Sequence, residues 1–306
     1  MSRRSIFILA VTVVVLYFSL ILFMLTPLHG AKSVYFRNNY INQLSLRRVP
    51  AVNWCKDLRW KTPPGSDVVA LVSFPGSGNT WLRYLLQQVT GIMTGSIYMD
   101  YGLRNHGFPA ENVTDGSVLV VKTHEAPPAD NKFKAAILLI RDPRDAILVP
   151  SSCFFIFHHT PHCTKQGYWE GYVWSQIRAW SALHRLWLRQ FQGRLLVVHY
   201  ELLRADTRDT LLNILAFLNH TVSQDDMNCA LGNREGIYRR KKKLENFDPF
   251  SADMYNDLNR ARTHILSLVN QYNTKTNQTV LYKTVFKVRT KFKPVARSVP
   301  LRSIER

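Results

Sequence analysis

The stretch Ser73-Phe74-Pro75-Gly76-Ser77-Gly78-Asn79-Thr80-Trp81 decides the fold of this chain. It is preceded by residues 68–72, an apolar run rich in β-branched side chains, which is typical of a strand buried on both faces. It is followed by a helical pattern that places four apolar side chains on one face: Leu82, Leu85, Leu86 and Val89. A buried strand that leads through a glycine-rich turn into a helix predicts an α/β domain.

The turn itself, residues 75–80, indicates a phosphate site. A turn of this kind exposes backbone N–H groups, and the helix dipole adds partial positive charge at the same place. Ser77, Asn79 and Thr80 add side-chain donors. The nucleoside triphosphatase pattern GxxxxGK[ST] does not fit, because no lysine follows Gly78. A plain strand-to-helix turn is the alternative to a binding loop.

Strands and helices alternate along the rest of the chain. Three further strands are expected, at residues 117–122, 135–140 and 195–199. Four helices are expected between or after them, at residues 145–155, 168–190, 207–219 and 251–272. This alternation predicts a central parallel sheet flanked by helices.

Two of the expected strands end in basic side chains. Lys122-Thr123-His124 follows one strand, and Arg141-Asp142-Pro143-Arg144-Asp145 follows the next. The carboxyl ends of parallel strands meet at one edge of a sheet, where ligands bind. Histidine is suited to proton transfer, lysine to stabilising negative charge and arginine to clamping phosphate. We therefore predict a shared site, with a purely structural histidine and an Arg–Asp ion pair as the alternatives.

These elements, in this order, resemble the sulfotransferase superfamily. There the loop is PKSGTTW, a KTH strand end supplies the catalytic histidine, and an RxPxD strand end supplies an arginine. Residues 196–203 are similar to the family's VxYEDL segment, and residues 234–240 to its basic RxG segment. The resemblance covers about residues 67–272. It implies a P-loop-like α/β fold and an enzyme that uses 3′-phosphoadenosine-5′-phosphosulfate (PAPS) without a metal.

The resemblance also implies roles for individual residues. His124 would take the acceptor proton, and Lys122 would stabilise charge on the leaving phosphate. Arg141, with Arg239 or Arg240, would hold the 3′-phosphate, and Trp81 would stack on adenine. The 5′ end of PAPS would lie on the loop residues Pro75, Gly76, Ser77, Gly78, Asn79 and Thr80.

Two positions depart from the family pattern. The lysine of PKSGTTW is Gly76 here, so Lys122 or a basic residue from 239–243 would take its role. The serine expected eight residues after Arg141 is Val149, so Ser151 or Ser152 would replace it. A catalytically weak protein is the other outcome of these departures.

The variant PGSGNTW, together with residues 90–96, resembles the WSC-domain-containing (WSCD) sulfotransferases. That family implies type II Golgi membrane proteins that act on sialylated glycans. Four cysteines are too few for the cysteine-rich WSC modules. The chain therefore resembles a short form that holds the catalytic domain alone.

The N-terminal residues 6–25 predict a membrane anchor. These twenty residues carry no charge and as a helix would span roughly 30 Å, the thickness of a bilayer core. Arg3 and Arg4 precede them, which favours a cytoplasmic N-terminus and a lumenal domain. A cleaved signal peptide is the alternative, but the apolar run is longer than such peptides need. The expected order is a cytoplasmic tail (1–5), the anchor (6–25), a stem (26–66), the catalytic domain (67–272) and a basic tail (273–306).

Three further features agree with a lumenal location. Glycosylation sequons begin at Asn112, Asn219 and Asn277. An oxidising lumen favours disulfides among Cys55, Cys153, Cys163 and Cys229, and Cys153–Cys163 is the first pairing expected because the two are close in sequence. Cys153 and Cys163 with His158, His159 and His162 could be drawn as a zinc site, although the resemblance implies no metal.

The charge of the chain bears on its partners. Its net charge of +19 attracts polyanions, but the charge alone does not indicate which kind of polyanion binds. The resemblance favours a glycan acceptor over nucleic acid and leaves the oligomeric state open. A Golgi glycosyltransferase would share the anchor, but many of these hold a metal with a DxD motif, which this chain lacks. A non-catalytic relative that kept the fold is the remaining alternative.

Overall fold

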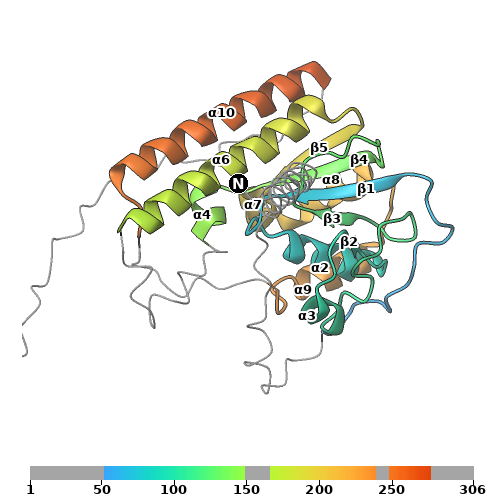
Figure 1. Cartoon of the computed structure of the whole chain (residues 1–306). Coiled ribbons are helices and arrows are strands. Elements are labelled where there is room, and N and C mark those ends of the chain that lie inside the picture. Colours follow the sequence, from blue (N-terminus) through green and yellow to red (C-terminus); the bar gives the residue numbers. More distant parts are fainter. Residues whose placement is uncertain (1–51, 149–165, 239–247, 277–306) are drawn as a thin grey trace, which may run out of the picture. The chain divides into compact units, whose positions relative to one another are not determined.

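The computed structural model describes residues 52–148, 166–238 and 248–276. Within these ranges, five strands form one sheet in the order β2-β3-β1-β4-β5, and every strand pairing is parallel (Figure 1). The strands are β1 (Val68–Ser73), β2 (Gly95–Ser96), β3 (Val121–Thr123), β4 (Phe133–Ile140) and β5 (Arg194–His199). The predicted α/β fold with a central parallel sheet is confirmed.

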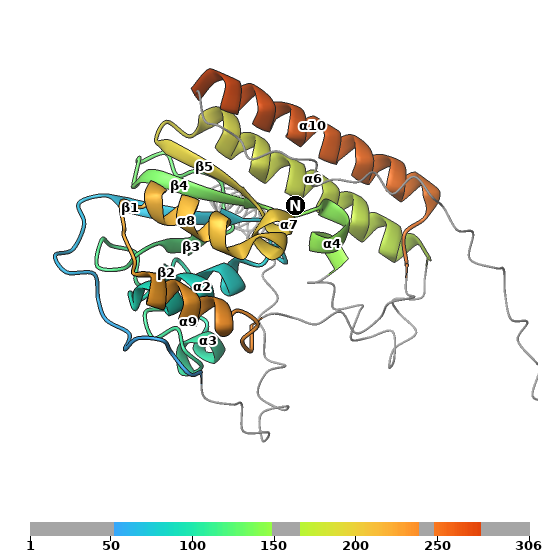
Figure 2. The same ribbon diagram turned by 180° about the vertical axis from the view of Figure 1, so that it is seen from behind.

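Helices cover both faces of this sheet. They are α2 (Asn79–Thr90), α3 (Tyr101–Asn105), α4 (Pro143–Leu148), α6 (Gln166–Gln190), α7 (Tyr200–Ala205), α8 (Thr207–Phe217), α9 (Gln224–Gly232) and α10 (Ala252–Thr276). The long helices α6 and α10 run side by side on one face, and α2, α8 and α9 lie on the other (Figures 1 and 2). Parallel strands covered on both faces are mostly apolar, and β1 and β4 follow this pattern apart from Ser73 and the exposed Lys134.

The alternation of side chains along β1 divides the core in two. Ala70 and Val72 belong to the cluster that includes Trp180 and Trp187 of α6. Leu71, between them, belongs to the cluster that includes Leu85 of α2. Successive side chains of a strand point to opposite faces, so one strand serves both layers. This packing fixes the carboxyl end of β1, from which the glycine-rich loop departs.

The observed elements that were expected differ mainly at their ends, whereas helices α3, α7 and α9 were not predicted. The strand expected at 117–122 is β3, which occupies only Val121–Thr123. The helix expected at 145–155 begins earlier, at Pro143, and is described only to Leu148. The two-residue strand β2 was not predicted, because it is too short to show an alternating pattern.

The segment before β1 takes part in the folded domain. The backbone N–H of Arg59 donates to Gly91 O, the N–H of Met93 donates to Arg59 O, and the N–H of Lys61 donates to Ser117 O. A disulfide joins Cys55 to Cys229. Part of the range expected to be stem, from residue 52, is therefore tied to the domain.

Several sequence predictions fall outside the described residues. They are the anchor at 6–25, the Cys153–Cys163 pairing, the proposed zinc ligands and the tail beyond residue 276. Among the helices that the structure describes, none has the length and apolarity needed to span a bilayer.

Candidate active site

The glycine-rich loop leaves β1 and enters α2 through two left-handed backbone positions. Gly76 has φ 82° and Gly78 has φ 94°, conformations that favour glycine. A Cβ atom at Gly78 would lie 2.6 Å from a ring carbon of Tyr200, so this glycine is also required by space. No side chain of the described residues caps α2, and the first turn of this helix carries no acidic residue. The first backbone N–H groups of the helix and its dipole are thus available to an anion.

The polar side chains of the loop divide into two groups. The amide nitrogen of Asn79 donates to Leu71 O at 3.0 Å and to Ser73 Oγ at 3.1 Å, so it holds the loop to β1. The hydroxyl of Ser77 is buried and has no hydrogen-bond partner among the described residues. A buried polar atom without a partner is costly unless a ligand satisfies it. Ser77 is therefore the better candidate for a direct contact with an anion.

Trp81 links the loop to a distant segment. Its side chain is almost fully buried, and its indole N–H donates to Arg234 O at 2.7 Å. Its ring meets that of Tyr200 edge-on, with 5.7 Å between centroids. The residue directly after the loop thus holds the start of the basic segment that follows α9.

His124, just past the end of β3, is tied to the end of the neighbouring strand β1. Its Nδ1 lies 2.6 Å from the carbonyl oxygen of Ser73. A carbonyl oxygen only accepts, so Nδ1 carries the proton and the lone pair is on Nε2. The backbone N–H of His124 donates to the hydroxyl of Tyr98, whose ring stacks on the imidazole at 5.7 Å between centroids. These contacts fix both the tautomer and the orientation of the imidazole.

Burial lowers the pKa of His124 to about 3, and the nearby charge of Lys122 acts in the same direction. Burial lowers the pKa of Lys122 to about 8, with the charge of Arg83 as the second cause. At neutral pH the imidazole is therefore a neutral base and the lysine remains largely an ammonium group. Lys122 Nζ also lies 5.7 Å from the centroid of the Tyr98 ring, which places both basic groups against one tyrosine.

Arg141, at the end of β4, contacts the loop. Strand β4 flanks β1 on the side opposite to β3. Arg141 Nη1 donates to Gly76 O at 2.7 Å, and the guanidinium lies 4.3 Å from the centroid of the Tyr200 ring. Asp145 is 3.9 Å away, at the limit of an ion pair. The buried Nε of Arg141 has no hydrogen-bond partner among the described residues. The guanidinium is held beside the position where the family has its loop lysine.

The structure brings His124, Lys122 and Arg141 to one edge of the sheet with the loop, as predicted. Two tyrosines that the motif analysis did not single out complete this group. Tyr98 contacts His124 and Lys122, and Tyr200 contacts Gly78, Trp81 and Arg141. The position of Tyr200 in the VxYEDL-like segment was the available signal for it, whereas Tyr98 lies in no motif.

The remaining predicted residues are placed as follows. His199, in the VxYEDL-like segment, is buried at the end of β5, which favours a structural role. Asn112 and Asn219 are exposed in the left-handed backbone region, with φ 68° and 51°. Ser151, Arg239, Arg240 and Asn277 lie outside the described residues.

The described side chains fit an anionic nucleotide end. Among the described residues, the buried donors Ser77 Oγ and Arg141 Nε lack partners, as does the acceptor Asn79 Oδ1, and no side chain caps the start of α2. In the described ranges, no group of three or more His, Cys, Asp and Glu side chains could hold a metal ion.

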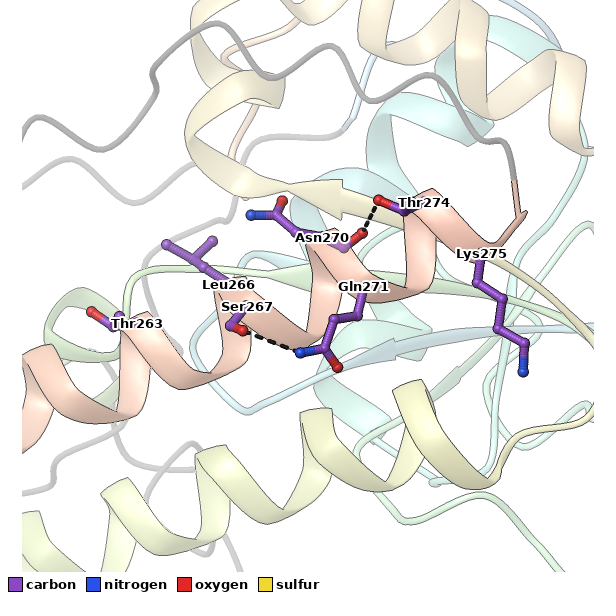
Figure 3. Close-up of a pocket in the computed structure, with 7 residues that line it drawn as sticks. All are labelled: Thr263, Leu266, Ser267, Asn270, Gln271, Thr274 and Lys275. Carbon is purple, nitrogen blue, oxygen red and sulfur yellow. Dashed lines mark hydrogen bonds between the residues drawn. The ribbon is translucent and has the colours of Figure 1, made fainter.

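A separate hollow lies on α10 (Figure 3). Its lining residues are Thr263, Leu266, Ser267, Asn270, Gln271, Thr274 and Lys275. All of them belong to one helix, and none belongs to the loop or to a strand end. This hollow is therefore not part of the site described above.

Comparisons with known proteins agree with this arrangement. Residues 66–259 match the family model of the sulfotransferase domain. A WSCD family member of Aedes aegypti is 41% identical over 258 residues, which cover 74% of this chain and 81% of the relative. A WSCD family member of Drosophila melanogaster is 41% identical over 254 residues, covering 72% and 80%.

Among solved structures, mouse sulfotransferase SULT7A1 complexed with PAP is similar over 70% of this chain and 90% of that one, at 15% identity and a TM-score of 0.47. The family model covers most of the chain, and the insect relatives exceed 40% identity over most of both sequences. The chain therefore belongs to the sulfotransferase family and, within it, to the WSCD proteins.

Proposed function

We propose that this sulfotransferase transfers a sulfuryl group from PAPS to a hydroxyl of a glycan in the Golgi lumen. The observation that carries the proposal is the hydrogen bond from His124 Nδ1 to Ser73 O. It leaves a lone pair on Nε2 beside the loop that suits the phosphosulfate end of the donor. Membership of the sulfotransferase family supports PAPS as that donor.

Each residue of the site has a separate role in the reaction. His124 Nε2 accepts the proton of the acceptor hydroxyl while the acceptor oxygen bonds to sulfur and the bond from sulfur to the phosphate oxygen breaks. Lys122 stabilises the negative charge that this cleavage leaves on the phosphate. Loop N–H groups and Ser77 hold the 5′ end. Arg141, with Arg239 or Arg240, holds the 3′-phosphate, and Trp81 contacts adenine.

The low pKa of His124 fits this role when the donor is considered. Burial and the charge of Lys122 keep the free imidazole neutral, which is the form a base requires. Bound PAPS brings negative charge next to Lys122 and so opposes the effect of the ammonium group on the imidazole. We expect the pKa of His124 to rise when the donor binds.

A glycan acceptor is supported by the exposed side chains that follow Tyr98, the tyrosine that contacts His124. Tyr98 is followed by Met99 and Tyr101, and the side chain of Tyr101 is 68% exposed. An exposed aromatic ring three residues after the tyrosine that stacks on His124 can pack against a sugar. The net charge of +19 favours an acidic acceptor, such as the sialylated glycans that the family resemblance implies.

A type II membrane protein with the catalytic domain in the lumen follows from residues 6–25 and from Arg3 and Arg4. Glycosylation at Asn112, Asn219 and Asn277 belongs to the same proposal. Protease added to sealed microsomes should spare nearly the whole chain, and a glycosidase should shift its mass after detergent treatment. Digestion of the domain without detergent would contradict this topology.

One observation favours a second candidate, a non-catalytic relative that binds the nucleotide or a glycan. Gly76 stands where the family has its lysine, and Arg141 Nη1 lies at the Gly76 carbonyl instead. The two functions are separated by measuring binding and turnover together. Binding of 3′-phosphoadenosine-5′-phosphate (PAP) with sulfuryl transfer supports the enzyme, and binding without transfer to any glycan supports the relative.

A further inference from the structure

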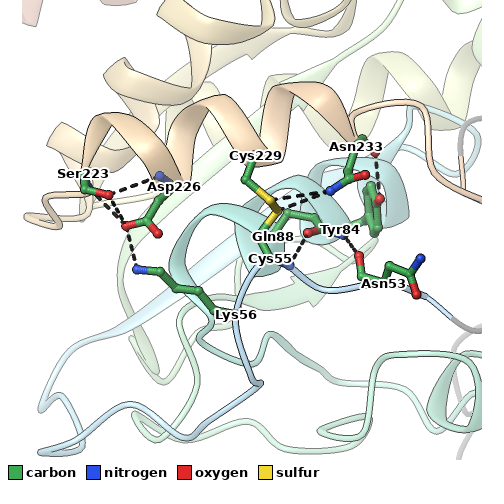
Figure 4. The surroundings of a disulfide bond; sticks show 9 residues. All are labelled: Asn53, Cys55, Lys56, Tyr84, Gln88, Ser223, Asp226, Cys229 and Asn233. Carbon is green, nitrogen blue, oxygen red and sulfur yellow. Dashed lines mark hydrogen bonds and ion pairs between the residues drawn. A yellow bond between two sulfur atoms is a disulfide. The ribbon is translucent and has the colours of Figure 1, made fainter.

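The Cys55–Cys229 disulfide joins two parts of the chain that are 174 residues apart in sequence. Cys55 lies in the segment before β1, and Cys229 lies in the last turn of α9 (Figure 4). Helix α9 packs on α2, the helix that begins at the glycine-rich loop. The disulfide is thus attached to α9, which packs directly on the helix that begins at the loop.

The Cys55 segment is itself fixed on both sides of the disulfide (Figure 4). The backbone N–H of Cys55 donates to Gln88 Oε1 at 2.9 Å, and Gln88 Nε2 donates to Asn53 O at 2.8 Å. Gln88 is fully buried in α2. Lys56 forms an ion pair with Asp226 at 2.6 Å. Cys55 therefore gives α9 a covalent attachment to a segment that is already anchored to α2.

The residues that follow α9 pack closely against the first turns of α2. Asn233 Nδ2 lies 3.4 Å from Cys55 Sγ and 3.6 Å from Cys229 Sγ. The hydroxyl of Tyr84 donates to Asn233 O at 2.7 Å, next to the bond from Trp81 to Arg234 O. Gly236 has φ 46°, and a Cβ atom there would lie 2.6 Å from the Tyr84 ring.

We propose that the disulfide positions residues 233–238 for binding of the donor nucleotide. The proposal rests on the proposed function, because it takes the loop as the donor site. Trp81 follows the loop directly and holds Arg234 O, and the Arg234 side chain is 46% exposed at this place. With the disulfide, the segment is ordered before the nucleotide arrives. Without it, binding must also order the segment, and affinity falls.

The test compares three variants of the full chain with the wild type. Cys55→Ser/Cys229→Ser removes the disulfide and leaves no unpaired thiol from it. Tyr84→Phe keeps the disulfide and removes the hydrogen bond to Asn233 O. Lys56→Ala is the matched control. It removes the neighbouring ion pair with Asp226 but keeps the disulfide and the hydrogen bond from Tyr84 to Asn233 O. Each protein is measured by calorimetry with PAP, by donor kinetics and by hydrogen exchange.

We expect the double variant to raise the Kd for PAP and the KM for PAPS about tenfold, with kcat at saturating donor within about twofold of the wild type. Tyr84→Phe should raise the same two constants by about threefold, and Lys56→Ala should change neither. Amide exchange should accelerate at residues 233–238 while β1 and β4 keep their protection. A merely stabilising disulfide would not produce this split between KM and kcat.

An unchanged Kd in the folded double variant would overturn the proposal. If that variant does not fold, an unchanged Kd in Tyr84→Phe overturns it instead. If the wild type itself does not bind PAP, the proposed function fails. In that case the exchange at residues 233–238 still decides whether the disulfide orders them: faster exchange supports this and unchanged exchange contradicts it.

Discussion

His124 Nδ1 and the carbonyl oxygen of Ser73 are 2.6 Å apart and join the ends of two neighbouring strands. Ser73 is the last residue of β1, and the loop that suits the donor begins two residues later. The base and the loop are thus part of one rigid edge. The predictions below follow from this edge and from the buried groups around it.

Replacing Arg141 by alanine should weaken nucleotide binding without unfolding the domain. The substitution removes a guanidinium that lies at the loop carbonyl of Gly76. Loss of a charged hydrogen bond to the nucleotide should cost about 1–3 kcal/mol of binding free energy. Calorimetry with PAP measures the loss, and adenosine without phosphates serves as the control ligand. Equal affinities for PAP and adenosine would contradict a phosphate site here.

Lys122 should make the capture of PAPS depend on pH in the alkaline range. Its pKa is lowered to about 8, so the ammonium form is lost as the pH rises through this value. The ratio kcat/KM for the donor, which reports groups of the free enzyme, should then fall above about pH 8. Lys122→Arg keeps its charge and should lose this decline. A profile that is the same in the wild type and in Lys122→Arg would assign the decline to another group.

The ion pair between Arg83 and Glu111 should behave as a buried structural pair. Both side chains are fully buried, with 2.6 Å between Nη1 and Oε1. Thr94 accepts two more bonds from Arg83, and the Phe108 ring lies 4.3 Å from its guanidinium carbon. Glu111→Leu strands the Arg83 charge and should lower the free energy of unfolding by about 3–5 kcal/mol.

The matched variant for this pair is Arg83→Met/Glu111→Leu, which removes both charges. It should be less destabilised than Glu111→Leu alone, because no buried charge is left without a partner. Denaturant unfolding of the single and double variants measures the difference. A double variant less stable than Glu111→Leu would show that the pair does not act as a unit.

Buried histidines should make the domain sensitive to acid, and His184 and His199 add to the effect of His124. Burial lowers the pKa of His184 and of His199 to about 4. An unfolded histidine has a pKa of about 6.5, so below this value the unfolded chain binds more protons than the native one. Stability is therefore fully present above about pH 6.5 and falls as the pH drops toward 4, by up to about 3 kcal/mol for each histidine.

The melting temperature as a function of pH measures this effect. His184→Met should flatten the decline between pH 6.5 and 4, because it removes one of the groups that binds a proton only in the unfolded chain in this range. His264→Ala, on the exposed face of α10, is the control and should keep the full decline. The same pH dependence in all three proteins would refute the assignment to His184.

The sequence was most informative where local pattern and packing agree. The apolar run of β1 and the glycines of the loop predicted the strand, the turn and the helix, because each of these features follows from near neighbours. The basic strand ends also predicted that Lys122, His124 and Arg141 would meet, because parallel strands end at a common edge.

The rest depends on contacts between distant residues. Cys55 and Cys229 are far apart in sequence, so their pairing has no local signal. Tyr98 contacts His124 only because β2, two residues long, lies beside β3. Asn79 was expected to bind the donor through its side chain, but its amide nitrogen faces Leu71 O and Ser73 Oγ. Helix periodicity alone cannot show which way a single polar side chain turns at a helix start.

The most direct test of the account is sulfuryl transfer by the His124→Ala variant. Sulfur-labelled PAPS is offered to wild-type, His124→Ala and His199→Ala proteins with glycans that do or do not carry sialic acid, and PAP binding is measured in parallel. We predict that His124→Ala lowers turnover by roughly 10² to 10⁴-fold with nearly unchanged PAP affinity, whereas His199→Ala mainly loses stability. Wild-type turnover in folded His124→Ala protein would contradict the assignment of His124 as the base.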